Sequence, residues 1–296
     1  MTVASIIHAP PAGLPSLDEC FFYHCLEVPG LGLQKGQWDL RSSVEAYLGG
    51  DVDFSGQRVL EVGPANGFLT FWMEGQGARV VGLELASGQD WDLVPYAGVD
   101  NVGFLESRRA LQRRLQRAFW LAHDAFGSSA GLTHESIYDV SPQVGEFDIA
   151  TFGMVLLHVR DPLQALGSVL GRVRKTAIVT EMFPWSELPH LESGFTARTE
   201  PWSADGRFEM PKPLQAELLS VPPAMFLLPR ASRQAPKETW WLFTPSLVGH
   251  YLAVLGFEQQ RIVYHYQPHD PRFQFHPPEK SGRTFHPCFT LVAERR

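Results

Sequence analysis

The chain has 296 residues, of which 44% are hydrophobic and 19% charged, so it is long enough to bury the core of one large α/β domain with an insertion. No apolar run of roughly 18 residues occurs, which excludes a membrane-spanning helix and predicts a soluble globular protein. The formal net charge of −7 disfavours a nucleic acid as the main partner, because such binding depends on clustered cations.

Apolar patterning from residue 58 onward predicts strands that alternate with helices or loops. Strands are predicted at residues 58–62, 79–84, 132–137, 147–152 and 177–180, and helices at 67–74, 106–126 and 162–173. A further helix starts at Thr244-Pro245 and stops at Gly256, and two last strands follow at 260–266 and 289–293. Five strands joined by crossovers indicate a parallel sheet with helices on both faces. We therefore predict an α/β fold: a Rossmann-like, doubly wound, seven-stranded mixed sheet that ends in an antiparallel strand pair.

Composition divides the chain into four parts. Residues 1–50 precede the first predicted strand, and residues 51–182 contain the five parallel strands. Residues 183–243 are rich in proline and aromatic residues without a sustained period, which predicts a cap inserted over the edge of the sheet. Residues 244–296 complete the sheet. The three cysteines, an odd number without CxxC spacing, predict reduced thiols and a cytoplasmic location: Cys20, Cys25 and Cys288.

The most informative motif follows the first predicted strand. Gly63 and Gly67 allow a tight turn and a close approach of the backbone to a ligand. A dinucleotide enzyme would place a pyrophosphate in this turn, but the carboxylate of Glu61 repels phosphate and attracts an ammonium group. The motif, which includes Pro64 and Phe68, therefore predicts S-adenosylmethionine rather than NAD as the cofactor.

Two further strand ends support a nucleoside-binding site. Glu84 ends the second predicted strand, where a carboxylate accepts hydrogen bonds from both ribose hydroxyls, and Leu85 follows it. After the third strand, Ser136-Ile137-Tyr138 provides an apolar wall and polar groups for adenine. The alternative for each of these three residues is an ordinary exit from strand to loop.

The loop after the fourth strand, Gly153 to Pro162, is the fourth part of the predicted site. It leaves the carboxyl edge of the sheet, where ligands of open α/β sheets bind, so Gly153 and Met154 are predicted to contact the cofactor. His158 in this loop suits proton transfer near neutral pH. A structural histidine that ties down the loop is the alternative.

Two polar clusters receive structural interpretations. An arginine-rich stretch of the predicted helix 106–126 is interpreted as a solvated face of a helix that packs away from the carboxyl edge of the sheet: Arg108, Arg109, Arg113, Arg114 and Arg117. Histidines and acids near the C-terminus lack the spacing of a compact ligand set, so no metal is predicted: His265, His269, Asp270, His276, Glu279 and His286.

At these motifs the chain resembles class I methyltransferases related to the tRNA wobble-uridine carboxymethyltransferases. The resemblance covers about residues 20–182, and its most similar segments are Trp38–Arg41, Tyr47–Gly49, Asp53–Gly63, Gly67–Leu69 and Gly153–Pro162. It implies the class I fold and S-adenosylmethionine as cofactor, and it is vague over the last hundred residues.

Two departures from the carboxymethylating enzymes bear on the substrate. As we align them, those enzymes have a tyrosine before the fourth-strand histidine and an arginine near the last strand, where this chain has Leu157 and Cys288. In the carboxymethylating enzymes, the tyrosine and the arginine serve the extra carboxylate of carboxy-S-adenosylmethionine. The resemblance therefore implies an enzyme that uses ordinary S-adenosylmethionine on a small-molecule acceptor. A tRNA wobble-uridine-modifying methyltransferase is the alternative, and a non-catalytic binding module on the same fold is a second alternative.

The resemblance also implies that the N-terminal segment folds over the methionine end of the cofactor. Arg41 would pair with the cofactor carboxylate, and Trp38 would lie near the sulfonium, whose charge favours an aromatic face. An N-terminal helix with a core tryptophan is the alternative. Because methyl transfer is an in-line displacement, the protein has to align the acceptor, exclude water and remove a proton. The candidate bases are His158, His24, Tyr23 and His190.

Overall fold

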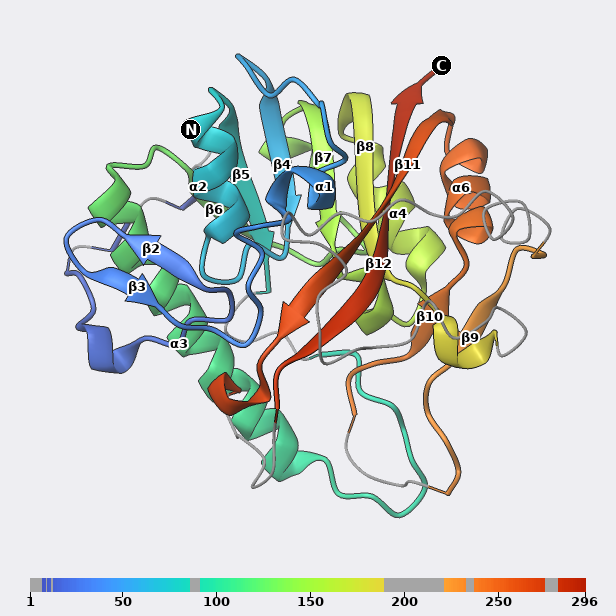
Figure 1. Cartoon of the computed structure of the whole chain (residues 1–296), viewed down its shortest axis with the longest axis horizontal. Helices are drawn as coiled ribbons and strands as arrows, with labels where there is room; N and C mark the ends of the chain where they lie inside the picture. Colours follow the sequence, from blue (N-terminus) through green and yellow to red (C-terminus); the bar gives the residue numbers. More distant parts are fainter. Residues whose placement is uncertain are drawn as a thin grey trace.

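The computed structural model describes residues 7–8, 10–11, 13–85, 91–188, 221–232, 237–274 and 282–296. Its centre is an eight-stranded sheet of order β1-β6-β5-β4-β7-β8-β12-β11 (Figure 1). Five strands run parallel: β4 (Arg58–Val62), β5 (Arg79–Glu84), β6 (Gly131–His134), β7 (Phe147–Gly153) and β8 (Val173–Met182). The antiparallel strands are β12 (Thr284–Arg295), β11 (Phe257–His269) and the edge strand β1 (Ile7–His8). The predicted seven-stranded mixed sheet is confirmed, and β1 adds an edge strand that the sequence did not predict.

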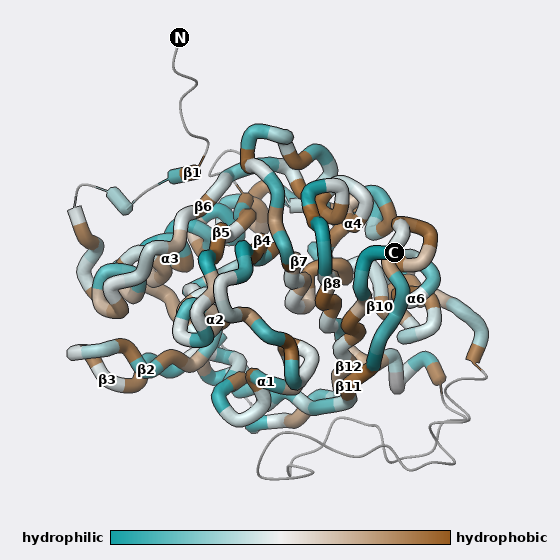
Figure 2. Tube along the Cα trace, turned by 90° about the horizontal axis from the view of Figure 1, so that it is seen from above, coloured by the Kyte–Doolittle hydropathy of each residue, from teal (hydrophilic) through white to brown (hydrophobic). Residues whose placement is uncertain are grey.

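Helices cover both faces of this sheet, as the view from above shows (Figure 2). One face carries α1 (Val44–Tyr47), α2 (Phe68–Gly75) and α3 (Val102–Phe126), and the other carries α4 (Pro162–Leu170) and α6 (Pro245–Val254). Successive side chains of a strand point to opposite faces. In β4, Val59 therefore packs in the core with Phe119 of α3, whereas Leu60 packs in the core with Leu166 of α4.

Local capping fixes the helix starts that position the loops. Asp161 Oδ1 accepts a hydrogen bond from the Gln164 N–H at 2.9 Å and precedes Pro162, the first residue of α4. Thr244 caps α6 in the same way. Gly127, with a φ of 61°, ends α3. Of these boundaries, the sequence predicted the start of α6 at Thr244-Pro245, and the structure has it there.

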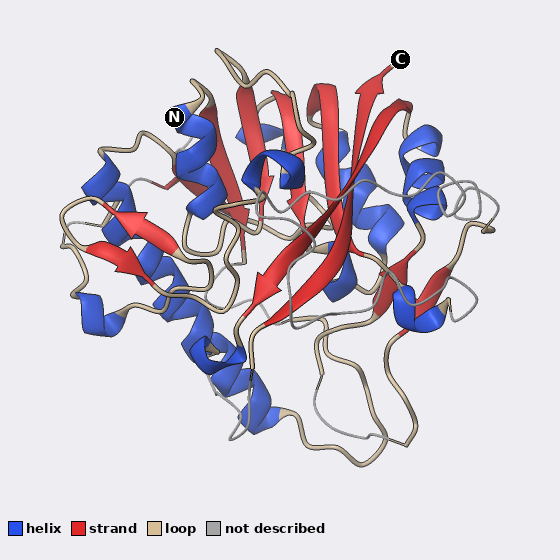
Figure 3. Ribbon diagram, viewed as in Figure 1, coloured by secondary structure: helices blue, strands red, loops and turns tan. Residues whose placement is uncertain are grey.

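The final strand pair extends beyond the parallel strands (strands red in Figure 3). The pairing of β12 with β8 starts at Cys288 opposite Met182, so residues 284–287 continue past the end of β8. Their partners on β11 are residues 266–269. This extension brings the last residues of β11 next to the N-terminal segment, where Trp38 forms an isolated bridge with His269.

Smaller elements surround the sheet. The hairpin β2 (Leu26–Val28) and β3 (Gly32–Gln34) belongs to the N-terminal segment, and β9 (Met225–Leu227) pairs with β10 (Trp241–Phe243) in the predicted cap. The other cap residues at 189–220 and 233–236, including His190, lie outside the described residues. Within the described part of the chain, no helix is both long and apolar enough to cross a membrane.

Candidate functional site

A cavity of about 740 Å³ lies at the carboxyl ends of the parallel strands. Every parallel strand contributes a lining residue at or just past its end: Gly63 after β4, Glu84 of β5, Glu135 after β6, Gly153 of β7 and Met182 of β8. Further wall residues come from the first half of α3, the N-terminal segment and residues 91–92, 238–239, 267 and 274. This is the edge of an open α/β sheet at which ligands bind.

Most of the predicted site residues line this cavity. They are Tyr23, His24, Trp38, Gly63, Glu84, Leu85, Ser136, Ile137, Tyr138, Gly153, Met154 and His158. Five predicted cofactor residues are not among the lining residues: Arg41, Glu61, Pro64, Gly67 and Phe68.

The glycine-containing turn after β4 has the backbone that its sequence predicts. Gly63 has a φ of 74° and donates its N–H to the Leu83 carbonyl at 3.0 Å. Gly67 has a φ of 85°, and a Cβ there would lie 2.5 Å from the Phe71 ring. A Cβ on Gly82 would meet the Pro64 ring at 2.7 Å. Pro64 and Gly67 therefore pack against Gly82 and Phe71 on the side of the turn away from the cavity, whereas Gly63 lines the cavity.

Two residues of the cavity wall adopt backbone conformations that side chains disfavour. Ala65 has a φ of 50° and Met154 a φ of 57°, and within the described ranges no other residue except glycine has a positive φ. Such conformations cost of order 1–3 kcal/mol each and concentrate at functional sites. Both residues follow the ends of parallel strands and line the cavity, so the strain coincides with the predicted site.

Asn66 fastens the N-terminal segment to the glycine turn. Its side chain is fully buried, and its Oδ1 accepts hydrogen bonds from the backbone N–H groups of Tyr23 at 3.1 Å and His24 at 2.7 Å. The Asn66 amide donates to the His24 carbonyl at 3.2 Å. The Trp38 N–H donates to the Tyr23 carbonyl at 3.0 Å, so Asn66 holds both parts of the segment at the cavity.

Glu61 lies behind the glycine turn rather than at the cavity surface. The Thr70 hydroxyl donates to its Oε2 at 2.5 Å, and burial raises the pKa of Glu61 to about 8 although the Thr70 hydrogen bond lowers it. The sequence analysis expected the Glu61 carboxylate to attract an ammonium group of the ligand. The structure instead places this carboxyl group outside the cavity wall. Glu84, in contrast, lines the cavity, and burial also raises its pKa.

Tyr138 organises the wall where adenine is expected. Its hydroxyl donates to the Asp92 carboxylate and accepts from the backbone N–H of Arg160 at 2.7 Å. The Tyr138 N–H in turn donates to Ser136 Oγ at 3.2 Å. These contacts tie residues 136–138 to residue 92 and to the loop after β7, so Tyr138 connects three wall segments.

The two histidines of the cavity differ in their partners. His158 Nδ1 lies 3.1 Å from the Glu238 carbonyl, and the rings of His158 and Trp91 meet edge to face at 5.6 Å. Burial lowers the pKa of His158, while the neighbouring Glu238 raises it. Burial lowers the pKa of His24 to about 3, and its Nδ1 has no hydrogen-bond partner among the described residues.

Helix α3 borders the cavity, so the expectation that it lies away from the carboxyl edge is wrong. Its first half lines the cavity with residues three to four positions apart: Phe104, Ser107, Arg108, Leu111, Gln112 and Leu115. Arg108 Nη2 pairs with Glu238 Oε1 at 2.7 Å. Farther along, Arg114 donates to the carbonyls of Asp18 and Cys20, and Arg117 pairs with Glu19 at 3.2 Å. Arg108, Arg114 and Arg117 therefore bind other parts of the chain.

Carboxyl groups outnumber cations in the cavity wall. The lining acids are Glu84, Asp92, Glu135 and Glu238, and among the described lining residues Arg108 is the single arginine or lysine. Arg108 pairs with Glu238, and Arg160, outside the wall, pairs with Asp92, so the excess of carboxyl groups rests on Glu84 and Glu135. In a partly buried site this excess favours a cationic ligand over a phosphate.

Arg41 lies at a different cavity. It pairs with Asp39 through Nε and Nη2, at 2.8 and 2.9 Å, and lines a second cavity of about 280 Å³. The structure therefore does not place Arg41 where it would meet a cofactor in the main cavity.

Several lining residues had no counterpart in the sequence analysis. Trp91 and Asp92 come from an unpatterned loop, Glu238 from the predicted cap, and Gln267 from the extension of β11. No local pattern marks these residues, because only the tertiary fold brings them to the cavity. The part of α3 that lines the cavity could have been found, since its apolar stripe is visible in the sequence.

No protein-family model and no curated protein matches the chain in sequence. Solved structures with a similar fold include magnesium protoporphyrin IX methyltransferase from Synechocystis PCC 6803 with bound S-adenosylhomocysteine, 14% identical with a TM-score of 0.43, covering 86% of this chain and 81% of that chain. The N-terminal domain of EvdMO1, solved in the presence of S-adenosylhomocysteine and D-fucose, is 18% identical with a TM-score of 0.47. The match covers 92% of this chain and 90% of that chain. An S-adenosylmethionine-dependent methyltransferase from Mesorhizobium loti is 16% identical with a TM-score of 0.46, and the match covers 86% of this chain and 97% of that chain.

Proposed function

We propose that the chain is an S-adenosylmethionine-dependent methyltransferase that acts on a small-molecule acceptor. The main support is the cavity at the carboxyl ends of the parallel strands, whose four carboxyl groups face one guanidinium group. This balance suits a ligand with a sulfonium and an ammonium group, and it opposes the pyrophosphate of NAD. When bound, S-adenosylmethionine supplies an electrophilic methyl carbon, so the chain needs no covalent nucleophile.

The residues of the wall fit this cofactor. Glu84 is proposed to accept hydrogen bonds from the ribose hydroxyls, and Ser136 and Ile137 to contact adenine. Gly63 and Gly153 allow close approach of the backbone: a Cβ on Gly153 would lie 2.6 Å from the Tyr47 hydroxyl and would narrow the cavity. Tyr23, His24 and Trp38 are proposed to lie at the methionine end.

The acceptor is proposed to be compact. Small-molecule pockets measure about 300–1,000 Å³, and the cavity of about 740 Å³ has to hold both the cofactor and the acceptor. Residues 238–239 line the cavity, and they are held there by the Arg108–Glu238 ion pair and by the backbone N–H of Trp240, which donates to the Leu157 carbonyl at 2.8 Å.

His158 is proposed to accept the proton of the acceptor. The Glu238 carbonyl can only accept, so Nδ1 of His158 carries the proton and Nε2 is available as a base. His24, with a pKa of about 3, is a weaker base. Burial raises the pKa of the Tyr23 hydroxyl, so Tyr23 keeps its proton and is suited to donate a hydrogen bond.

Calorimetry with the full chain tests the cofactor assignment. We expect saturable binding of S-adenosylhomocysteine and S-adenosylmethionine and no saturable binding of NAD, because the carboxyl groups of the cavity repel a pyrophosphate. Tight binding of NAD without binding of S-adenosylhomocysteine would overturn the proposal.

A gel-shift assay with tRNA tests the choice of a small acceptor. We expect no saturable binding near physiological salt, and no loss of cofactor binding when Arg109, Arg113 and Arg117 are changed together to Gln. Arg108 stays unchanged in this variant because it lines the cavity, and Arg114 because it donates to the backbone carbonyls of Asp18 and Cys20, whereas the Arg117–Glu19 ion pair joins two exposed side chains. Salt-sensitive tRNA binding that the triple variant abolishes would favour the wobble-uridine alternative instead.

A further inference from the structure

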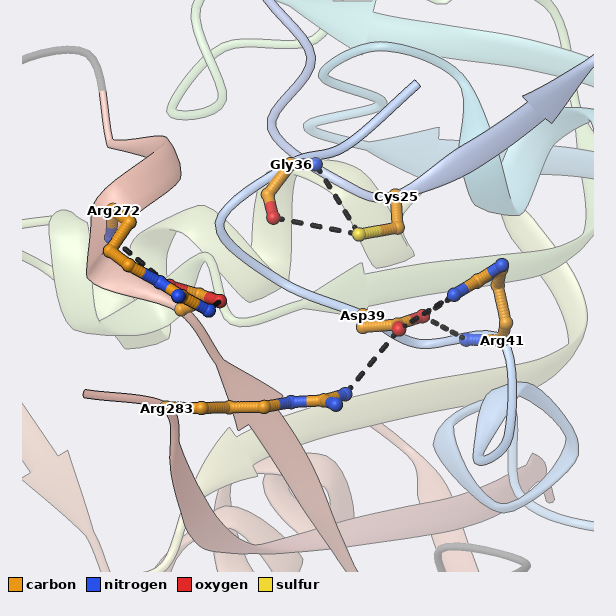
Figure 4. A network of polar contacts seen from close by, with 7 residues as sticks. Cys25, Gly36, Asp39, Arg41, Arg272 and Arg283 are labelled. Carbon is orange, nitrogen blue, oxygen red and sulfur yellow. Dashed lines mark hydrogen bonds and ion pairs between the residues drawn. The ribbon is translucent and has the colours of Figure 1, made fainter. Parts of the chain in front are cut away.

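We propose that the second cavity, where Arg41 lies, binds a small phosphate-type dianion. This cavity of about 280 Å³ lies between the N-terminal segment and the end of β11. Arg283, the residue directly before β12, also lines it (Figure 4). It is lined by Lys35, Arg41, Arg272 and Arg283, together with Asp39 and Asp270. The proposal concerns a ligand other than the cofactor and does not depend on methyl transfer.

Backbone hydrogen bonds give this cavity a fixed frame. The Asp39 N–H donates to the Pro268 carbonyl at 3.1 Å, and the Asp270 N–H donates to the Gln37 carbonyl at 2.7 Å. The Trp38 ring between them packs on His269 with ring centroids 4.4 Å apart. Segments that are distant in sequence thus hold the charged side chains in defined positions before any ligand binds, which reduces the ordering cost of binding.

The charges of the cavity do not cancel. Four cationic side chains face two carboxylates, which leaves an excess of two positive charges. Asp270 is bound by Arg272 through Nε and Nη2, at 2.8 and 2.5 Å. Asp39 is shared, because Arg283 also reaches it at 3.4 Å, and Figure 4 shows the Arg41 and Arg283 side chains converging on this carboxylate. The excess lies in a chain of net charge −7, so it is a local feature rather than part of a generally basic surface.

Donors remain for a ligand. Arg41 and Arg272 use Nε and Nη2 on their carboxylates, which leaves the Nη1 group of each without a hydrogen-bond partner among the described residues. The Lys35 ammonium lies 5.7 Å from the centre of the Phe273 ring, and within the described residues it makes no ion pair. Guanidinium and ammonium donors of this kind are the groups that bind phosphate oxygens in proteins.

The size of the cavity agrees with a phosphate group. A volume of about 280 Å³ corresponds to about nine water molecules in the liquid, enough for a phosphate with a small organic substituent. Phe273 in the wall offers an apolar surface to such a substituent. The main cavity has the opposite charge balance, so the two sites select ligands of opposite sign. Gln37 lines both cavities, which places the anion site next to the wall of the main one.

Titration of inorganic phosphate into the full chain, followed by calorimetry at constant ionic strength, tests this proposal. We expect saturable binding to one site, and about fivefold weaker binding in the Arg283→Gln variant, because one exposed cation is removed. The matched control is Arg174→Gln, which removes an exposed, ion-paired arginine from β8 and should leave phosphate binding unchanged. Asp39→Asn should strengthen phosphate binding, since it removes a carboxylate that competes with the ligand.

Further titrations identify the source and the charge of the anion. Phenyl phosphate that binds more tightly than inorganic phosphate would indicate the phosphate group of a metabolite, and the reverse order would indicate the free anion. Acetate should bind more weakly than either, because it carries a single charge. Absence of saturable phosphate binding, equal affinity for acetate, or equal weakening by Arg174→Gln and Arg283→Gln would overturn the proposal.

Discussion

Replacing Glu84 by alanine should weaken binding of S-adenosylhomocysteine by about 1.5–3 kcal/mol, the range for hydrogen bonds to a charged group. Glu84 ends β5, lines the cavity and accepts a hydrogen bond from the Leu85 N–H at 2.8 Å, which holds its carboxylate at the strand end. Calorimetry measures the loss directly. Glu106→Ala, an exposed acid on α3 outside the cavity wall, is the matched control and should bind like wild type.

The same carboxylate should make binding depend on pH. Burial raises the pKa of Glu84 in the free protein, and the ionised form accepts hydrogen bonds from hydroxyl groups more strongly than the neutral form. Binding of S-adenosylhomocysteine should therefore strengthen as the pH rises through the pKa of Glu84. Glu84→Gln should remove this dependence. If Glu84→Ala binds like wild type at every pH, the ribose site lies elsewhere.

The sequence predicts the strands with strong local patterns and misses features that depend on partners. The predicted bounds of β4 and β5 agree with the structure, because each is a short apolar run. The third strand was predicted to reach residue 137 but ends at His134, which pairs with Glu84 at the end of β5, so no partner remains beyond it. β11 and β12 are longer than predicted because their polar ends pair with each other.

The candidate site divides in the same way. Three lining residues lie at or just after predicted strand ends: Gly63, Glu84 and Gly153. Because the carboxyl ends of parallel strands meet at one edge of the sheet, their shared position can be predicted from the sequence. Glu238 and Gln267 reach the cavity only through tertiary contacts. Arg41 was assigned to the cofactor, yet Asp39, two residues earlier, binds its guanidinium group at the second cavity.

The free energy of unfolding should have a plateau between about pH 4.5 and 6.5 and should fall by up to about 4 kcal/mol between pH 6.5 and 8. Buried acids cause the fall at high pH: Glu61 and Glu181 contribute most, and Glu84, whose pKa burial also raises, adds to it. Burial raises the pKa of Glu61 and of Glu181 from 4.5 to about 8, although Glu181 Oε1 accepts a hydrogen bond from the Leu156 N–H at 2.8 Å. Folded protein therefore binds more protons than unfolded protein above pH 4.5, and this stabilisation is lost as the pH rises to about 8.

Two buried histidines act in the opposite direction. Burial lowers the pKa of His24 and of His265 from 6.5 to about 3, so the unfolded chain binds more protons below pH 6.5 and stability falls as the pH falls. Between pH 4.5 and 6.5 the two acids and the two histidines offset each other, which gives the plateau. Below pH 4.5 these histidines make stability fall as the pH falls, and above pH 6.5 these acids make it fall as the pH rises.

Urea unfolding at a series of pH values measures this profile. Glu61→Gln combined with Glu181→Gln replaces each neutral acid by an uncharged amide of similar shape, so the double variant should lose most of the fall above pH 6.5. Glu106→Gln, which changes an exposed acid, should keep the wild-type profile and thereby control for the removal of negative charge from a chain of net charge −7. A double variant that still loses stability as steeply as wild type above pH 6.5 would show that Glu61 and Glu181 are already ionised in the folded chain.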